Sequence, residues 1–421
     1  MKKVVKFILK YVFYKIPLYL ICALLIFFFF FYLVSPIYKF DKQGESVKDY
    51  EYWYNPYQKL ENQPHWYKIN FHAHSNAWGK ATNGRNNSVQ QINDAYTKLG
   101  FFAFSISDYQ TITKGSDNPH YIPVYEHGYN IPKAHQLSLG AQKVYPLDFP
   151  FFQTIHQKQY IINQLKDRCQ YLALAHPPHW GGYSADDLKH LSNYDLFEVL
   201  NHYCISENYW DTVLTAQKWV YLIANDDCHD VSQLSETGRR FTLIHDTVNI
   251  LPKIAKGESI GVDYPCILNE SINVKAERLK KLPELLVYKL EQDSVGSFIR
   301  IILKGAKGSV EFIGDNGKII GRTAMGDTLR FNIPSPNSLT YIRAKIHFMD
   351  GTVYYLNPII KVKEPGIIPA NPLTASVSNF QTWSLRVIGF LLLLLIVLNI
   401  RAWRKKAKEK KRSRYFANRY R

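Results

Sequence analysis

Two apolar runs, one near each end of the chain, constrain the fold most, because a run of about 20 apolar residues crosses a bilayer as a helix. The first run, residues 16–34, contains the block Phe27 to Phe31 and is not followed by the small-x-small site of a cleaved signal peptide. The second, residues 387–400, approaches spanning length when Trp383 to Leu385 are added. The sequence therefore predicts a transmembrane helix at each end, over residues 16–36 and 383–401.

The basic residues are concentrated outside these runs. Of the formal charge of +17, the first 15 residues carry +5 and residues 401–421 carry +10, which leaves +2 for the rest. A nucleic-acid-binding protein usually carries its basic surface on the folded domain, so we expect no nucleic-acid partner. Basic ends beside apolar runs follow the positive-inside rule instead. We expect a two-pass cell (inner) membrane protein with a cytoplasmic N-terminus (1–15), a cytoplasmic tail (402–421) and an extracytoplasmic middle.

The apolar pattern between the two runs changes character along the chain. Residues 37–65 have no clear period and are predicted to be a connector. From residue 66, short β-rich pieces alternate with helical stretches such as Ser88–Leu99 and Thr154–Asp167, which is typical of an α/β domain with a parallel, barrel-like sheet. We assign this domain to residues 66–282. The predicted strands are Tyr67–Phe71, Phe101–Ile106, Tyr121–Tyr125, Tyr171–Ala175, Leu196–Val199 and Val220–Ala224.

From residue 283 the period becomes two, which predicts a small all-β sandwich over residues 283–363. Asp315-Asn316-Gly317 and Asp350-Gly351 are typical hairpin turns within it. A linker, residues 364–382, leads to the second apolar run. With 421 residues and 46% hydrophobic content, the chain is large enough to build both cores.

Side chains that bind metals follow the predicted strands at or near their ends. In a strand, residues i and i+2 share a face, so the His72-Ala73-His74 and Asp227-Cys228-His229 pairs can each converge on one ion. A carboxylate between imidazoles can bridge two cations. The sequence predicts one metal site from these residues, and we expect Cys228 to be a buried free thiol that points away from it. The candidates are His72, His74, Asp108, Glu126, His135, His176, Asp227 and His229.

The order of these motifs resembles the PHP superfamily, named for polymerase and histidinol phosphatase domains. The resemblance covers about Trp66 to Val248. The matching segments are Phe71-His72-Ala73-His74-Ser75, Ser107-Asp108-Tyr109, Val124-Tyr125-Glu126, His135-Gln136-Leu137-Ser138-Leu139-Gly140, Ala175-His176-Pro177 and Asp226-Asp227-Cys228-His229. The resemblance implies a distorted parallel (β/α)7-type barrel.

The resemblance also implies the ligand sets. His72, His74, Glu126 and Asp227 would hold one metal, and Glu126, His135 and His176 a second. A third site normally uses an Asp after the first motif and a second-motif His; here Tyr109 replaces that His and residues 76–84 contain no Asp. We therefore expect two divalent ions, open among zinc, manganese and iron, with a third site in doubt. Three roles stay open for His229: a general acid, a substrate contact or a weak metal ligand.

Phosphoester hydrolysis is the activity that this reading predicts. Arg239 and Arg240 are the candidate substrate-binding cations, because guanidinium groups bind phosphoryl oxygens in a bidentate fork. Two alternatives stay open: hydrolysis of a carbamate or amide by the same site, and an inactive binding module, which Tyr109 and the missing Asp would favour. The chain contains neither the Gly-x-x-x-x-Gly-Lys-Ser/Thr loop of nucleotide-dependent proteins nor the Gly-x-Ser-x-Gly elbow of serine hydrolases, so both of these classes are disfavoured.

Overall fold

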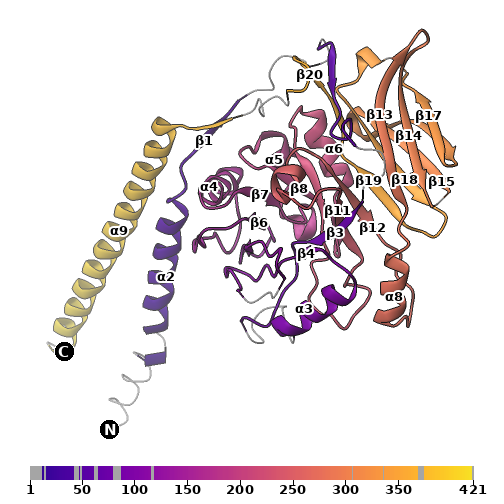
Figure 1. Cartoon of the computed structure of the whole chain (residues 1–421). Coiled ribbons are helices and arrows are strands. Elements are labelled where there is room, and N and C mark those ends of the chain that lie inside the picture. The colour runs from indigo at the N-terminus through magenta and orange to yellow at the C-terminus, as the bar shows by residue number, and fades with distance from the viewer. Residues whose placement is uncertain are drawn as a thin grey trace. The chain divides into compact units, whose positions relative to one another are not determined.

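The computed structural model forms two compact units, which we call the terminal unit (Met1–Lys39 with Ser376–Arg421) and the central unit (Phe40–Ala375). Figure 1 traces the chain from its N-terminus to its C-terminus. Most of the basic segment 1–15 that the sequence singled out lies outside the described residues. The structure describes residues 12–13, 16–41, 47, 50–60, 65–78, 87–114, 118–305, 307–334, 336–367 and 374–419.

The described residues of the terminal unit include the helices α2 (Ile16–Tyr32) and α9 (Asn379–Arg419). Residues Asn379–Lys410 of α9 are long and apolar enough to cross a membrane. The prediction of a transmembrane helix at each end is wrong for the first one: at 17 residues, α2 spans about 26 Å and falls short of a hydrocarbon core of about 30 Å. Within the described residues, α9 is the single helix that meets both criteria.

One sheet of the central unit mixes parallel and antiparallel strands. Its order is β10-β8-β7-β6-β5, with β9 paired to β8. The neighbours β10, β8 and β7 are parallel, whereas β6 runs antiparallel to both β7 and β5. The strands are β5 (Val124–His127), β6 (Gln136–Leu139), β7 (Tyr171–Leu174), β8 (Leu196–Asn201), β9 (Cys204–Ile205) and β10 (Tyr221–Ala224).

The other large sheet has the order β16-β15-β18-β19-β12-β11-β3-β4, with β20 joining β18 to β2. Apart from β3 and β4, the neighbours in it are antiparallel. The strands are β2 (Tyr52–Tyr54), β3 (Tyr67–Asn70), β4 (Ala103–Phe104), β11 (Arg240–Ile244), β12 (Ser259–Asp263), β15 (Gly308–Gly314), β16 (Lys318–Met325), β18 (Tyr341–Phe348), β19 (Val353–Leu356) and β20 (Ile359–Val362).

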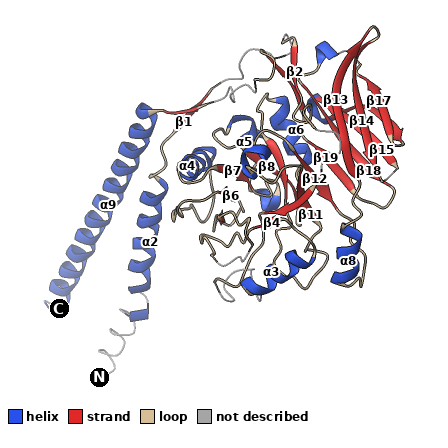
Figure 2. Cartoon of the chain, in the orientation of Figure 1, coloured by secondary structure: helices blue, strands red, loops and turns tan. Residues whose placement is uncertain are grey.

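The predicted parallel (β/α)7-type barrel is therefore wrong, because the described strands form several sheets that are mostly antiparallel (Figure 2). The strand β12 accounts for part of the error. It pairs with β11 on one side and β19 on the other, so a single sheet crosses the boundary drawn from sequence at residues 282 and 283. Gly261 interrupts the β-branched pattern of β12, and a Cβ there would lie 2.7 Å from the Leu222 Cδ1 methyl, so a larger residue would require the Leu222 side chain to move.

A three-stranded sheet, β13-β14-β17, packs on the C-terminal half of the central unit. Phe312 of β15 and Phe331 of β17 stack with centroids 3.9 Å apart, which joins this sheet to the larger one. The turns at Asp315–Gly317 and Asp350–Gly351 connect antiparallel pairs, as the sequence predicted. The strands are β13 (Glu284–Asp293), β14 (Gly296–Lys304) and β17 (Thr328–Asn332), and β1 (Tyr38–Phe40) pairs separately with β21 (Ala375–Val377).

The helices of the central unit begin where the sequence carries caps. Ser88 accepts the Gln91 N–H at 3.1 Å before α3, and Thr154 precedes α4. Lys275 of α8 is buried and donates to the carbonyls of Leu234 and Thr237. The helices are α3 (Val89–Lys98), α4 (Ile155–Lys166), α5 (Ala185–His190), α6 (Glu207–Thr215), α7 (Ile250–Ile254) and α8 (Ile272–Leu279).

One buried apolar cluster joins the two large sheets near the candidate ligands. It contains Ile69 of β3, Leu137 of β6, Ala173 of β7, Leu196 of β8 and Ile223 of β10. Because these strands pack through a common core, the residues at their ends have fixed relative positions. The core thus positions the segments that carry the candidate site.

Candidate metal centre

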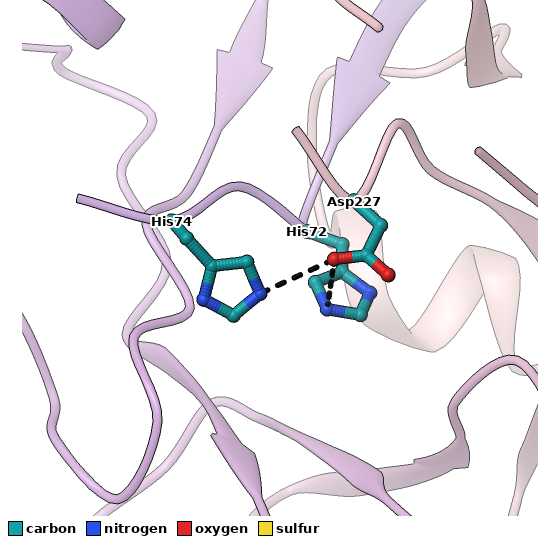
Figure 3. Close-up of side chains that lie close together, drawn as sticks. All are labelled: His72, His74 and Asp227. Atoms are coloured by element: carbon teal, nitrogen blue, oxygen red, sulfur yellow. Dashed lines mark ion pairs between the residues drawn. The ribbon is translucent and has the colours of Figure 1, made fainter. Parts of the chain in front are cut away.

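Two backbone segments lie side by side at the centre of the site. The segment after β3 and the segment after β10 form a parallel bridge between Ala73 and Cys228, and the His74 N–H donates to the Cys228 carbonyl at 2.9 Å. The side chains of Ala73 and Cys228 are buried in the apolar core, and the Cys228 Sγ lies 3.2 Å from the Thr237 hydroxyl. The flanking residues His72, His74 and Asp227 meet on the other side of this bridge (Figure 3).

Four ligand atoms converge at separations that suit one cation. The Asp227 Oδ1 lies 3.1 Å from His72 Nε2 and 3.2 Å from His74 Nε2. The Glu126 Oε2 lies 3.4 Å and 3.2 Å from the same two nitrogens. Ligand atoms about 2.1 Å from a tetrahedral zinc ion lie about 3.4 Å apart. The four nitrogen-to-oxygen separations are therefore close to those between neighbouring ligand atoms around one cation.

The second oxygen of Glu126 faces a different pair of imidazoles. Its Oε1 lies 2.7 Å from His135 Nδ1 and 2.9 Å from His176 Nε2. His72, Glu126 and His176 form a second buried group whose ligand atoms lie within 4.8 Å of one another. His135 reaches the site from the start of β6, because that strand runs antiparallel to its neighbours. Glu126 has the placement of a bridging carboxylate.

The hydrogen bonds of this cluster leave ligand atoms without partners. Buried donors and acceptors are almost always satisfied, so a group of unsatisfied ones calls for a physical cause. Four here have no hydrogen-bond partner and face one another, and a metal ion accounts for them better than a protein contact would. These atoms are His72 Nε2, His74 Nε2, Glu126 Oε2 and Asp227 Oδ1. The donor set therefore fits a divalent cation.

The electrostatics of the cluster also require positive charge at its centre. Burial by itself raises the pKa of Glu126 and Asp227, but the neighbouring imidazoles outweigh burial and lower both pKa values well below the usual range. Burial lowers the pKa of His72, yet the carboxylates of Asp227, Glu198 and Glu126 raise it well above its usual value. Two ionised carboxylates in a buried site are stabilised by adjacent positive charge, which a divalent cation supplies.

Glu198, which the sequence reading missed, connects several of these ligands. Its Oε1 accepts from His72 Nδ1 and from Asn225 Nδ2, both at 2.9 Å. Its Oε2 accepts from the His176 N–H at 2.8 Å and from Asn201 Nδ2 at 2.9 Å. A proton on His72 Nδ1 leaves Nε2 as the ligand atom, as in carboxylate–histidine–metal arrangements. The sequence feature that could have identified Glu198 is its charge, because it lies inside the otherwise apolar predicted strand Leu196–Val199.

Two ligand-bearing residues have strained backbones. His176 has φ 28° and Asp227 has φ 50°, in a region that side chains other than glycine rarely adopt. Such strain persists where surrounding contacts enforce it, and it clusters at functional sites. At His176, the hydrogen bond from its own N–H to Glu198 is one such contact.

The second-motif residues do not act as ligands in this structure. Asp108 accepts the Ser75 N–H at 2.7 Å and the Ser75 hydroxyl at 2.6 Å, so it anchors the segment after His74. The Tyr109 ring stacks on His74 with centroids 4.6 Å apart and meets the edge of His135 at 5.5 Å. A tyrosine ring thus lies against two imidazoles of the cluster.

His229 lies at the edge of the cluster. Its Nε2 is 3.4 Å from Asp227 Oδ1, and its ring stacks on His74 at 4.4 Å. Burial, followed by the positive charge of His74, lowers the pKa of His229 to about 3, so the imidazole is neutral near pH 7. A neutral imidazole suits a ligand or an acceptor, and the general-acid role of His229 stays a prediction.

The two arginines chosen from sequence lie in a separate ion-pair group. Arg240 is buried, with Nε 3.2 Å from Asp263 and a further hydrogen bond to the Asn201 carbonyl. Arg239 Nε lies 3.6 Å from the same carboxylate. Their substrate-binding role stays a prediction. Among the described residues, Lys133 is a cation near the cluster, and its Nζ lies 5.8 Å from the centre of the Tyr109 ring.

Comparisons of the chain with protein-family models, with curated proteins and with solved structures found no match. The fold and the site geometry therefore define a class only: a protein with a buried His, Glu and Asp cluster that can hold a metal ion and with a helix able to cross a membrane.

Proposed function

We propose that this chain is a membrane-anchored, metal-dependent hydrolase that cleaves phosphoesters. One observation carries the proposal: the buried imidazole nitrogens of His72 and His74 each lie 3.1 to 3.4 Å from a carboxylate oxygen of Asp227 and from one of Glu126. Mixed imidazole and carboxylate ligation suits zinc, manganese or iron.

We infer a second cation from the bridging placement of Glu126. Its Oε1 with His135 and His176 would form that site, while Oε2 serves the first. When bound, divalent cations activate water as a nucleophile and neutralise charge on a phosphoryl group. A third cation is not part of the proposal, because Tyr109 fills the position of its imidazole.

The chain's own residues orient the ligand side chains and exclude bulk water from the metal centre. Glu198 fixes the ring of His72, and Asn201 donates to Asp227 Oδ2 at 3.0 Å, so the ligands are held before a substrate arrives. The ligand side chains are almost fully buried, which strengthens every charge interaction at the site. Lys133 and His179 are partly exposed and lie beside Tyr109 and His176, and we propose that they contact a substrate anion.

The proposed location follows from α9 alone. Its apolar part is followed by a strongly basic tail, and basic flanks stay on the cytoplasmic side. The central unit, which precedes α9, would then lie outside the cytoplasm. Its substrates would be phosphoesters met there.

The test combines metal analysis with turnover. The purified full chain would be analysed for bound metal and assayed on phosphate monoesters, phosphate diesters and carbamates, beside Asp227→Asn. We expect bound zinc, manganese or iron in the wild type and at least about a hundredfold loss of metal affinity and turnover in the variant. Asp195→Asn, which removes a carboxylate paired with Lys166 far from the cluster, is the matched control and should keep its metal.

The substrate assays distinguish a phosphoesterase from a carbonyl hydrolase and from a binding module. Carbamate or amide turnover without phosphoester turnover would select the carbonyl hydrolase. Bound metal without turnover on any substrate would select a binding module. A chain that stays metal-free after incubation with each of the three metals would refute the proposal.

A further inference from the structure

The turn that follows the candidate ligand His176 exposes a tryptophan. Residues 177–182 have the sequence Pro-Pro-His-Trp-Gly-Gly, and Trp180, within the 3-10 turn His179–Gly181, is 73% exposed. The Trp180 backbone has φ 50°, in a region that side chains other than glycine rarely adopt. Because strained conformations cluster at functional sites, a large ring kept exposed in this way points to a binding role.

Hydrogen bonds and packing fix the backbone on both sides of Trp180. The His179 N–H donates to the His176 carbonyl at 2.8 Å, and the Gly182 N–H donates to the His179 carbonyl at 3.0 Å. A Cβ on Gly182 would lie 2.5 Å from the Lys133 carbonyl oxygen, so the turn packs closely against the segment that carries Lys133. The Trp180 side chain therefore extends from a well-defined backbone.

Ring contacts lead from the buried cluster to Trp180. The centre of the His176 ring lies 5.3 Å from that of His179, and the centre of the His179 ring lies 6.3 Å from that of Trp180. Exposure rises along this series, because His176 is buried, His179 is partly exposed and Trp180 is exposed. The series therefore connects the candidate metal centre with the protein surface.

Tyr203 also contacts His179, with ring centres 4.9 Å apart, and is 42% exposed. The Tyr203 N–H donates to Asn201 Oδ1 at 2.9 Å, while Asn201 Nδ2 donates to the candidate ligand Asp227 at 3.0 Å. The hydrogen bonds that orient the ligands thus position Tyr203 as well. We call the three rings of His179, Trp180 and Tyr203 the ring platform.

The chemistry of the ring platform favours a small, flat occupant. Aromatic rings stack on other planar rings and gain more from this than from the burial of area alone. Residues 177–182 carry no large apolar side chain besides Trp180, whereas a stable protein interface buries about 800 Å² on each partner. One ring of a small molecule therefore suits the platform better than a protein surface does.

We propose that the ring platform is a substrate subsite that selects phosphoesters whose organic group contains a planar ring. The phosphoryl group lies at the metal centre, and the ring of the organic group stacks on Trp180. The inference rests on the proposed function, because it takes the cations to hold the phosphoryl group. Trp180 acts as a specificity-determining residue, since it contacts the organic group and not the reacting bond.

The test measures the binding of two phosphonates, which have no ester bond to hydrolyse. One carries a phenylpropyl group and the other a cyclohexylpropyl group, so they share a flexible tether and differ in the planarity of the ring. Calorimetry on the full chain, incubated with zinc, would give both dissociation constants for the wild type, Trp180→Phe and Trp180→Leu. The two variants form a matched pair, because each keeps a Cβ at the strained position and only Trp180→Phe keeps an aromatic ring.

We expect the wild type and Trp180→Phe to bind the phenyl compound about three- to tenfold more tightly than the cyclohexyl compound. In Trp180→Leu this ratio should fall close to one. A ratio near one in the wild type, an unchanged ratio in Trp180→Leu, or binding of neither compound would overturn the subsite.

The outcomes separate the subsite from the proposed function. Metal binding and phosphoester turnover without a preference for the phenyl compound would reject the subsite and keep the proposed function. A preference for the phenyl compound that Trp180→Leu abolishes, in a chain that turns over no phosphoester, would support the subsite and reject the proposed activity.

Discussion

Replacing Glu198 by Gln tests whether a residue that binds no metal controls the metal centre. The carboxylate accepts four hydrogen bonds, two on each oxygen, from the side chains of His72, Asn225 and Asn201 and from the His176 N–H. An amide keeps one accepting oxygen and turns an NH2 group toward the other two donors. Two buried hydrogen bonds are lost when the NH2 group faces the two N–H donors of His176 and Asn201, and one is lost when it faces Asn225 and His72.

The expected magnitude follows from these contacts. If the NH2 group faces His72, the imidazole proton moves to Nε2 and blocks the ligand atom; if it faces His176, the strained backbone there loses its acceptor. Loss of such an outer partner typically lowers metal affinity about 10- to 100-fold. Each unsatisfied buried donor costs about 1 to 3 kcal/mol, so the metal-free chain, with one or two such donors, should lose roughly 1 to 6 kcal/mol of stability.

The assay measures the two effects separately. Chelator competition gives metal affinity, and denaturant unfolding with excess chelator gives the stability of the metal-free chain. Asp148→Asn is the matched control, because Asp148 is also a fully buried carboxylate with four donors and lies outside the ligand cluster. It should lose stability with metal affinity unchanged. The reasoning is refuted if Glu198→Gln binds metal as tightly as the wild type, or if both variants lose affinity equally.

Two further predictions concern a buried thiol and a buried amine. Cys228→Ala should cost about 1 kcal/mol of stability and leave metal content unchanged, because Sγ packs in the core beside Thr237; elemental analysis showing lost metal would contradict this. Burial lowers the pKa of Lys218 from 10.5 to about 7, while its Nζ donates to the Leu188 and Leu191 carbonyls. Between pH 7 and 10.5 the unfolded chain then binds a proton that the folded chain does not, so stability should rise with pH by at most about 1.4 kcal/mol per unit. Denaturant midpoints at pH 7, 8 and 9 check this against Lys218→Met, and a constant difference between the two proteins would count against it.

Local patterns in the sequence located most of the elements around the site. The predicted strand Tyr171–Ala175 is observed as Tyr171–Leu174, and the predicted helix Thr154–Asp167 as Ile155–Lys166 with Thr154 as its cap. Periodicity and capping act within a few residues, so they can be read without knowing the fold. The His-x-His and Asp-x-His pairs belong to the same category, because alternation along an extended segment already sets which side chains share a face.

Strand direction was decided by the tertiary structure. An apolar strand has the same pattern whether its neighbour is parallel or antiparallel, so the antiparallel β6 and the joining strand β12 were invisible in sequence. The ion-pair and hydrogen-bond partners are also distant in the sequence. Arg240 pairs with Asp263 in β12, and Glu198 bonds to His72, which lies 126 positions away along the chain. The sequence by itself determined which ligand types the chain carries and where its segments turn extended or helical. Packing alone decided which oxygen faces which imidazole, because hydrogen bonds and burial depend on neighbours that only the folded core brings together.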